Sequence, residues 1–189
     1  MLSLGMDIGT STVKLVLLKN QEIEKQWMAV HHGNPFVCLK KGLSALELDA
    51  DTPFSLCVTG SNTEALLEQA PDIPSFGDIP AVVEGVRQIV PQAGSVIEIG
   101  SQGARFITDL QSRAPQFAVN EHCAGGTGSF FEDQMSRVGC RLGDYSSLVE
   151  QAQSVPRLSG RCAVFAKTDI IHRQQEGVST PDILLGLCY

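Results

Sequence analysis

The sequence lacks the features that place a protein in a membrane or on nucleic acid. Its formal net charge is -7, from 14 basic and 21 acidic residues, so it offers no basic surface for nucleic acid or anionic lipid. No apolar run reaches the length that spans a bilayer. The first seven residues also lack the basic start and long apolar centre of a signal peptide. We therefore expect a cytoplasmic protein with neither nucleic-acid nor membrane partners.

Cysteines are present, but not in the spacings of the common metal and redox motifs. The 6 cysteines are scattered and include no CxxC pair, which argues against a zinc ribbon, a thioredoxin-type motif and a ferredoxin-type run. Without a secretion signal, reduced thiols are expected rather than disulfides. Cys57 lies in an apolar run and is interpreted as a residue of a strand core. Cys38, Cys140 and Cys188 have no accompanying signal.

The common nucleotide-binding fingerprints are missing as well. There is no GxxxxGK[ST] loop, and no GxGxxG follows a strand and opens a helix. The 189 residues are nevertheless 43% hydrophobic and 19% charged, which indicates a folded protein of one domain, or of one lobe and part of another. No internal repeat of solenoid period is visible.

Apolar periodicity predicts an α/β protein with two sets of strands. Strands at residues 3–7, 12–18 and 22–30 are expected to form an antiparallel meander with a tight first turn. Further strands are predicted at residues 54–59, 95–99, 104–109 and 116–119, and helices at 35–48, 62–69, 81–90, 127–138, 144–154, 164–175 and 181–189. The proline-rich segment 71–80 is predicted to be a loop. Because the last helix has no polar stop signal, we expect a fragment of a longer protein.

The turn between the first two strands is a candidate phosphate site. Its residues Gly9, Thr10, Ser11, Thr12 and Lys14 supply close backbone approach, hydroxyls, amides and one cation. Asp7, at the end of the first strand, would hold a magnesium ion through water. An ordinary polar hairpin is the alternative interpretation, which the pattern alone leaves open.

A second candidate phosphate site repeats this arrangement. One strand ends at the acid Glu98, and the turn that follows consists of Gly100, Ser101, Gln102 and Gly103. Two such turns, facing each other across a cleft, would grip the two ends of a triphosphate. Further along the chain, Gly125, Gly126, Thr127 and Gly128 would contact phosphate through backbone amides at a helix start.

Two cysteines stand beside helix-like runs. Cys123 precedes the glycine-rich turn at Gly125, and Cys162 precedes a second apolar run. Two thiols of this kind can supply half of a four-thiolate metal centre at a two-fold axis. The helix near Thr127 would then direct its N-terminal amides at an anionic cluster or phosphate. The alternative is that both cysteines are buried small hydrophobic residues, and the local pattern alone favours it.

Four segments together resemble one protein family. They are residues 7–11, 97–102, 120–128 and 162–166, which read DIGTS, IEIGSQ, NEHCAGGTG and CAVFA. The family comprises the ATP-dependent activators (component A) of 2-hydroxyacyl-CoA dehydratases and the related ATP-binding subunits of benzoyl-CoA reductase. The resemblance runs from the first strand to the end of the chain, and the segment around Cys123 is its most specific part.

The resemblance implies the actin/Hsp70/sugar-kinase fold, in which two lobes with related, ribonuclease H-like βββαβα cores close on ATP and magnesium. Residues 1–90 would form the first lobe, and residues 91–189 an incomplete second lobe. Family members form dimers that share one [4Fe–4S] cluster, and Cys123 and Cys162 would be the ligands from each subunit. ATP hydrolysis drives an electron from the cluster into a partner dehydratase or reductase, and a ferredoxin or flavodoxin would supply that electron.

The second turn departs from the family pattern. It usually reads Asp-Ile-Gly-Gly-Gln-Asp, whereas here Glu98, Ser101 and Gly103 replace two acids and a glycine. Glu98 keeps a carboxylate, so Asp7 and Glu98 are the predicted catalytic residues. The acid missing at Gly103 would affect how magnesium or water is positioned. Some relatives carry two modules in one polypeptide, in which case the cluster would bridge modules instead of identical subunits.

Two other functions remain open on the sequence. A sugar or acyl-phosphate kinase of the same fold would use the same phosphate turns, but it needs no paired cysteines. A non-enzymatic, degenerate nucleotide-binding or dimerisation module would fit the altered second turn.

Overall fold

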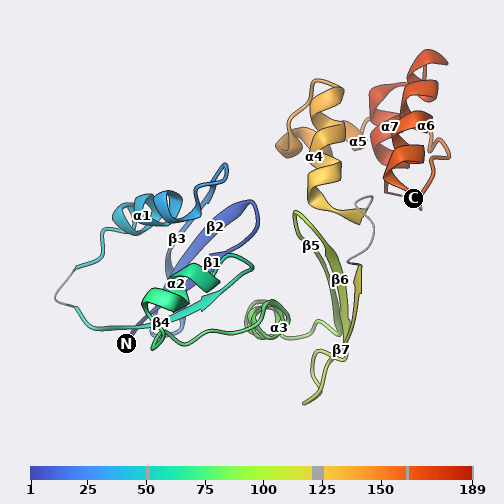
Figure 1. The fold of residues 1–189 in the computed structure, drawn as a ribbon. Coiled ribbons are helices and arrows are strands. Elements are labelled where there is room, and N and C mark those ends of the chain that lie inside the picture. The colour runs from blue at the N-terminus through green and yellow to red at the C-terminus, as the bar shows by residue number, and fades with distance from the viewer. Residues whose placement is uncertain (50–51, 121–125, 161, 189) are drawn as a thin grey trace. The chain divides into compact units, whose positions relative to one another are not determined.

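Two compact units make up the chain, Met1–Ala93 and Gly94–Tyr189. In this computed structural model, residues 1–49, 52–120, 126–160 and 162–188 are described. The first unit contains β1 (Leu2–Ile8), β2 (Thr12–Lys19), β3 (Glu22–Val30), α1 (Pro35–Ala45), β4 (Phe54–Thr59), α2 (Glu64–Gln69) and α3 (Asp78–Ile89) (Figure 1). The second contains β5 (Ser95–Ile99), β6 (Ala104–Thr108), β7 (Gln116–Asn120), α4 (Gly128–Arg137), the 3-10 helix η2 (Leu142–Asp144), α5 (Tyr145–Val149), α6 (Ala163–Gln175) and α7 (Thr180–Gly186). None of the described helices combines the length and apolar character needed to cross a membrane.

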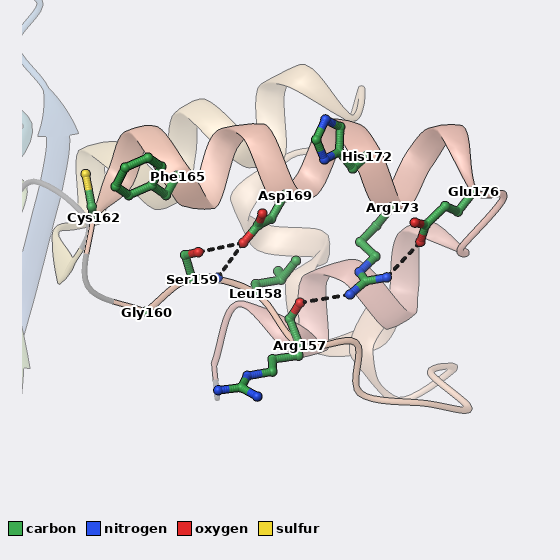
Figure 2. A pocket seen from close by; sticks show the side chains of 10 residues that line it. All are labelled: Arg157, Leu158, Ser159, Gly160, Cys162, Phe165, Asp169, His172, Arg173 and Glu176. Carbon is green, nitrogen blue, oxygen red and sulfur yellow. Dashed lines mark hydrogen bonds and ion pairs between the residues drawn. The ribbon is translucent and has the colours of Figure 1, made fainter.

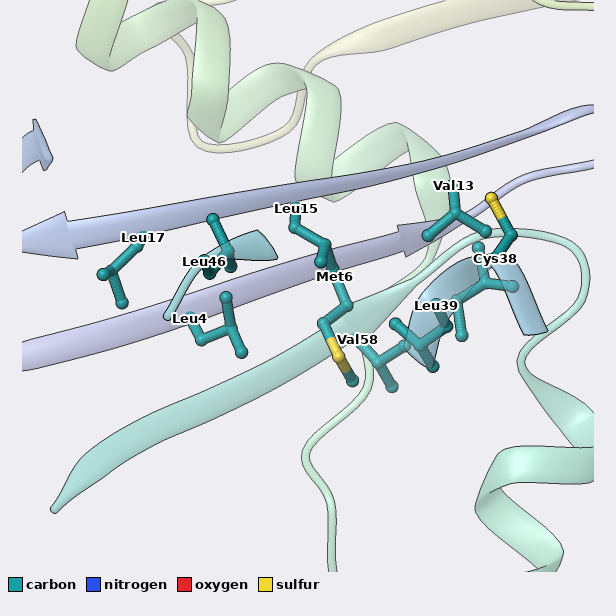
Figure 3. Close-up of a cluster of buried hydrophobic side chains, with 10 residues drawn as sticks. Leu4, Met6, Val13, Leu15, Leu17, Cys38, Leu39, Leu46 and Val58 are labelled. Atoms are coloured by element: carbon teal, nitrogen blue, oxygen red, sulfur yellow. The ribbon is translucent and has the colours of Figure 1, made fainter. Parts of the chain in front are cut away.

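The first unit is built on a four-stranded sheet in the order β3-β2-β1-β4. β1 and β2 are antiparallel, whereas β4 runs parallel to β1. Alternate residues of a strand point to opposite faces, so one face of β1 and β2 carries a regular row of apolar side chains. These side chains and their neighbours form the buried core, which includes Leu4, Met6, Val13, Leu15, Leu17, Cys38, Leu39, Leu46 and Val58 (Figure 3).

Helix α1 lies directly on this core. A Cβ added to Gly42 would lie 2.5 Å from the ring of Trp27 and 2.7 Å from Leu15, so the absence of a side chain lets the helix approach the sheet. Cys38 is buried on the same helix. Cys57, on β4, is partly buried, and its burial raises the pKa of the thiol.

The second unit opens with a three-stranded antiparallel sheet in the order β5-β6-β7. Its helices pack around a separate set of buried residues, among them Met135, Ile183 and Leu184. The rings of Phe131 and Tyr145 meet edge to face, with their centroids 4.6 Å apart. Both units therefore begin with a strand meander and continue into helices, which confirms the predicted α/β class.

Several predicted helix boundaries are wrong. The helices predicted to end at residues 48 and 189 end with α1 at Ala45 and with α7 at Gly186. Two further errors have a clear physical cause. The loop predicted at 71–80 ends early because α3 begins at Asp78 and includes Pro80 in its first turn, where a missing N–H is tolerated. The helix predicted at 144–154 ends with α5 at Val149. Beyond it, the backbone N–H groups of Gln153 and Ser154 donate to the Asp182 carboxylate, at 2.6 and 2.8 Å, which favours a non-helical path.

Candidate functional site

The turn between β1 and β2 is closed by its own backbone. The Gly9 N–H donates to the Thr12 carbonyl at 2.9 Å, and a Cβ on Gly9 would lie only 3.3 Å from that oxygen. Asp7 and Lys14 are partners across the hairpin, and the Lys14 Nζ lies 2.6 Å from Asp7 Oδ2. A carboxylate and a cation are therefore fixed next to a glycine turn. Thr10, at the tip of this turn, is exposed.

The β4–α2 connection holds this turn in place, although none of its residues is among the predicted site residues. Asn62 donates its side-chain N–H to the Gly9 carbonyl at 2.8 Å and its backbone N–H to the Ile8 carbonyl at 2.9 Å. The hydroxyls of Ser61 and Thr10 are 2.9 Å apart. The sequence did contain a signal for this connection, since a glycine and polar residues directly follow the strand predicted at 54–59, as they do after β1.

His31 supports the same turn from the end of β3. Its backbone N–H donates to the Ser11 carbonyl at 3.0 Å, and its Nε2 lies 3.2 Å from the Gly9 carbonyl. The Gly33 N–H donates to Nδ1 at 3.1 Å, so the hydrogen-bond partners assign the proton to Nε2. The side chain is buried, with 9% of its surface exposed. The side chains of Asn62 and His31 thus both hold the carbonyl of Gly9.

The turn between β5 and β6 has the same construction. The Gly100 N–H donates to the Gly103 carbonyl at 2.8 Å. Glu98 and Arg105 are partners across the hairpin, and their side chains form an ion pair of 2.8 Å. Each unit therefore has a hairpin in which an acid before the turn pairs with a cation after it. Gln102 lies exposed at the tip of the second turn.

Helix α4 begins directly against this second turn. The Gly128 N–H donates to the Gly100 carbonyl at 2.8 Å, and the Ser129 N–H donates to the Ser101 carbonyl at 3.1 Å. The hydroxyls of Ser101 and Ser129 are 2.7 Å apart. The first amides of α4, which were expected to face a phosphate or cluster, are thus used by the turn, because the helix start packs against its carbonyls.

The remaining residues of this glycine-rich segment are only partly described. Thr127 is buried and accepts a hydrogen bond from the Phe130 N–H at 3.3 Å, as the N-cap of α4. Gly126 is exposed, and a Cβ there would lie 2.8 Å from the Asn120 side chain. The predicted ligand Cys123 and the predicted phosphate contact Gly125 lie outside the described residues.

Cys162 stands at the start of α6, in the N-cap position. Its backbone is extended, with φ -144° and ψ 123°, and its carbonyl accepts a hydrogen bond from the Ala166 N–H at 2.9 Å. The thiol is free and half-buried. The positive end of a helix stabilises a thiolate, so this position suits a metal-binding or reactive sulfur. No group of three or more His, Cys, Asp or Glu residues suited to a metal ion occurs in the described ranges.

A cavity of about 700 Å³ lies between α6 and the chain that precedes Cys162. Its lining consists of Arg157, Leu158, Ser159, Gly160, Cys162, Phe165, Asp169, His172, Arg173 and Glu176 (Figure 2). Several of the charged groups are paired with neighbours: Arg173 contacts Glu176 at 2.7 Å, and Asp169 accepts hydrogen bonds from Ser159. The bonds from Ser159 hold the pKa of the Asp169 carboxyl below its usual value.

An ion pair joins α4 to α6. The Lys167 Nζ lies 2.7 Å from Asp133 Oδ2, and Arg137 approaches the same oxygen at 3.4 Å. The hydrogen bond from Lys167 is the main reason that the pKa of Asp133 is lowered. The two helices that follow the cysteine segments are therefore linked through one carboxylate.

Comparisons with known proteins give consistent matches along the chain. The BadF/BadG/BcrA/BcrD ATPase family matches residues 4–189. The chain is similar to one of the subunits of the benzoyl-CoA reductase of Thauera aromatica, with 28% identity over 97% of this chain and 67% of the relative. It is also similar to the activator of lactoyl-CoA dehydratase of Anaerotignum propionicum, with 29% identity over 99% of this chain and 73% of the relative. Among solved structures, the ADPNP-bound activator of the 2-hydroxyisocaproyl-CoA dehydratase from Clostridium difficile has a TM-score of 0.86 and 26% identity, over 99% of this chain and 70% of its own.

Proposed function

The chain belongs to the BadF/BadG/BcrA/BcrD ATPase family, and on this premise we propose that it is an ATP-hydrolysing, iron–sulfur electron-transfer activator. Its partner would be a 2-hydroxyacyl-CoA dehydratase or a benzoyl-CoA reductase-like enzyme. The matches confirm the family and the actin-like α/β fold predicted from the sequence. The names of the relatives support this class of partner, and the relative with bound ADPNP supports ATP as the nucleotide.

The repeated turn is the observation that carries the proposal. Each unit contains a hairpin with an acid, a backbone-closed glycine turn and a cation at matching positions. Catalysis of phosphoryl transfer depends mainly on positioning and on stabilisation of charge, and loops of this kind supply both. The Gly9 turn and the Gly100 turn would each bind phosphate. Asp7 would hold hydrated magnesium, because its side chain is 33% exposed beside the turn.

The surroundings of Cys162 fit a thiolate ligand. The sulfur is free, half-buried and placed at the N-terminus of a 13-residue helix, where negative charge is stabilised. We assign Cys162 and Cys123 as the cluster ligands from this chain. The same pair would come from a second subunit, or from a second module of a longer polypeptide. When bound, a [4Fe–4S] cluster supplies a one-electron carrier. A ferredoxin or flavodoxin would be its donor.

Anaerobic reconstitution with iron and sulfide tests the ligand assignment. We expect about four irons per dimer in the parent protein and loss of this iron in Cys123→Ser and in Cys162→Ser, because four thiolates hold such a cluster. Cys57→Ser is a matched control, since that thiol lies in β4. Unchanged iron content in both ligand variants would refute the assignment. A kinase of the same fold would bind nucleotide without taking up iron.

A second experiment separates ATP turnover from the cluster. Asp7→Asn should abolish ATP hydrolysis and leave the iron content unchanged, because Asp7 belongs to the Gly9 turn of the first unit. Asp72→Asn, at an exposed position of the same unit, is the control. Normal hydrolysis by the Asp7→Asn protein would contradict the role given to this carboxylate.

A further inference from the structure

Residues 152–160 have no regular structure and yet are held at both ends, and we call them the strap. At its start, Asp182 on α7 accepts the N–H groups of Gln153 and Ser154, at 2.6 and 2.8 Å. At its end, Asp169 on α6 accepts the N–H and the hydroxyl of Ser159, at 2.9 and 2.6 Å (Figure 2). Carboxylates of the two following helices thus replace the hydrogen bonds that a helix or strand would supply.

The middle of the strap lies close to both helices. A Cβ added to Gly186, on α7, would lie 2.6 Å from the Pro156 carbonyl oxygen, so the backbones are in near contact there. Arg173, on α6, directs its guanidinium at the Arg157 carbonyl, at 3.5 Å. The Arg157 side chain itself points away from α6 (Figure 2). The strap is therefore a fixed part of the second unit.

We propose that Asp169 is a positioning residue for Cys162, which acts by fixing the direction in which the chain enters α6. This inference rests on the proposed role of Cys162 as a cluster ligand. Ser159 stands three residues before Cys162, a distance that the chain can span with roughly 10 Å of extended backbone. Asp169 stands seven residues after it, or roughly 10 Å along the helix axis. The bonds between Asp169 and Ser159 close this short stretch into a ring that contains Cys162.

Cys162 is constrained on both sides as a result. On its C-terminal side, its carbonyl is fixed by the first hydrogen bond of α6, from the Ala166 N–H. On its N-terminal side, Ser159, three residues away along the chain, is held by Asp169. Without the Asp169 bonds, Ser159 would be released from α6, and the thiol would sample several directions. A ligand of a rigid cluster needs one direction, because loosely held ligands give imprecise sites.

The chemistry of the two bonds suits this role. Hydrogen bonds to an ionised carboxylate are roughly twice as strong as neutral ones. Both bonds to Asp169 come from one residue, so they fix the orientation of Ser159 as well as its distance. The bonds from Ser159 lower the pKa of the Asp169 carboxyl, as expected for bonds that stabilise its ionised form.

The rate at which Cys162 is alkylated in the metal-free protein tests the inference, with the modified peptide quantified by mass spectrometry. We expect Asp169→Asn to change this rate by at least about threefold, because local opening of the strap controls access to the thiol. Ser159→Ala should change it in the same direction by a smaller factor, since it removes one of the two bonds and keeps the carboxylate charge. Asp182→Asn is the matched control: it weakens the distant end of the strap and should stay within about twofold of the parent.

Equal rates for Cys162 in the parent and in Asp169→Asn would overturn the inference, as would an equal change in Asp182→Asn. A second measurement uses the reconstituted protein. There, Asp169→Asn should shift the reduction potential or the electron paramagnetic resonance spectrum of the cluster, and Asp182→Asn should change neither. If the parent takes up no iron, the ligand role of Cys162 is refuted, while the alkylation rates still decide whether Asp169 positions this thiol.

Discussion

Gly60 is the position at which one added methyl group should disturb the first turn most. Its φ is +107°, and a Cβ there would lie 2.5 Å from the carbonyl carbon and oxygen of Ile8 and 2.7 Å from Oδ1 of Asp7. A left-handed backbone costs an L-residue about 1–2 kcal/mol. Forcing a methyl group against a packed backbone adds about 1–3 kcal/mol. We therefore expect Gly60→Ala to lower the unfolding free energy of the first unit by about 2–5 kcal/mol.

Gly33 supplies a matched control. Its φ is +83°, but a Cβ there would meet nothing within 4 Å. Gly33→Ala should therefore show only the backbone effect, about 1–2 kcal/mol, and the difference between the two variants measures the steric contact. Urea unfolding followed by the fluorescence of Trp27 is a suitable assay. This is the single tryptophan of the chain, and it packs against the core of the first unit.

The same pair of variants also probes the function of the turn. The added methyl group in Gly60→Ala would press on Ile8 and Asp7, so ATP affinity should fall under conditions in which both variants are folded. Gly33→Ala should bind ATP as the parent does. Equal unfolding free energies for the two variants, or unchanged ATP affinity in Gly60→Ala, would refute the steric argument.

Three further predictions concern the second unit. Leu184→Ala should lower the unfolding free energy by about 2–5 kcal/mol in denaturation followed by circular dichroism, because this side chain is fully buried. The backbone N–H groups of Ser154 and Gln153 lower the pKa of the Asp182 carboxyl. The ionised carboxylate therefore stabilises the fold above the pKa that it has in the unfolded chain, and this stabilisation is lost as the pH falls through its pKa in the folded protein. Asp182→Asn should flatten the fall in melting temperature below about pH 4. Ser101→Ala should lower the unfolding free energy by about 1 kcal/mol, since it removes the hydroxyl contact with Ser129, and faster hydrogen exchange at the start of α4 would report it.

The local parts of the fold could be predicted from the sequence. β1, β2 and β5 were expected within about two residues of their positions, because alternation of apolar residues and glycine turns are properties of neighbouring residues. A distant contact accounts for the error at the end of α5. The helix predicted beyond Val149 is interrupted by the carboxylate of Asp182, which lies 28 residues from Ser154 along the chain. The support that Asn62 gives to Gly9 spans 53 residues.

In the candidate site, too, features formed by neighbouring residues could be predicted, whereas contacts between distant residues could not. The acids and glycines of both turns could be selected because each set is contiguous in the sequence. His31 could not, since it reaches the first turn only after β3 has been placed. The glycine and polar residues around Asn62 were a usable signal for a turn, but its contact with Gly9 depends on the placement of β4. For Cys162, the local pattern favoured a buried small hydrophobic residue, whereas the thiol is half-buried at a helix start. Resemblance to a family indicated a ligand role that apolar periodicity could not.

The parallel pairing of β1 with β4 has a consequence for the order of folding. β1, β2 and β3 are joined by short hairpins, whereas residue 2 pairs with residue 54 and residue 7 with residue 59. Closing so long a loop is slow, so β4 should join the sheet after the meander has formed. Contacts made after the transition state affect mainly the unfolding rate. Substitutions at the β4–α2 connection should thus shorten the lifetime of the folded first unit, and with it that of the turn at Gly9, while refolding proceeds at nearly the parent rate.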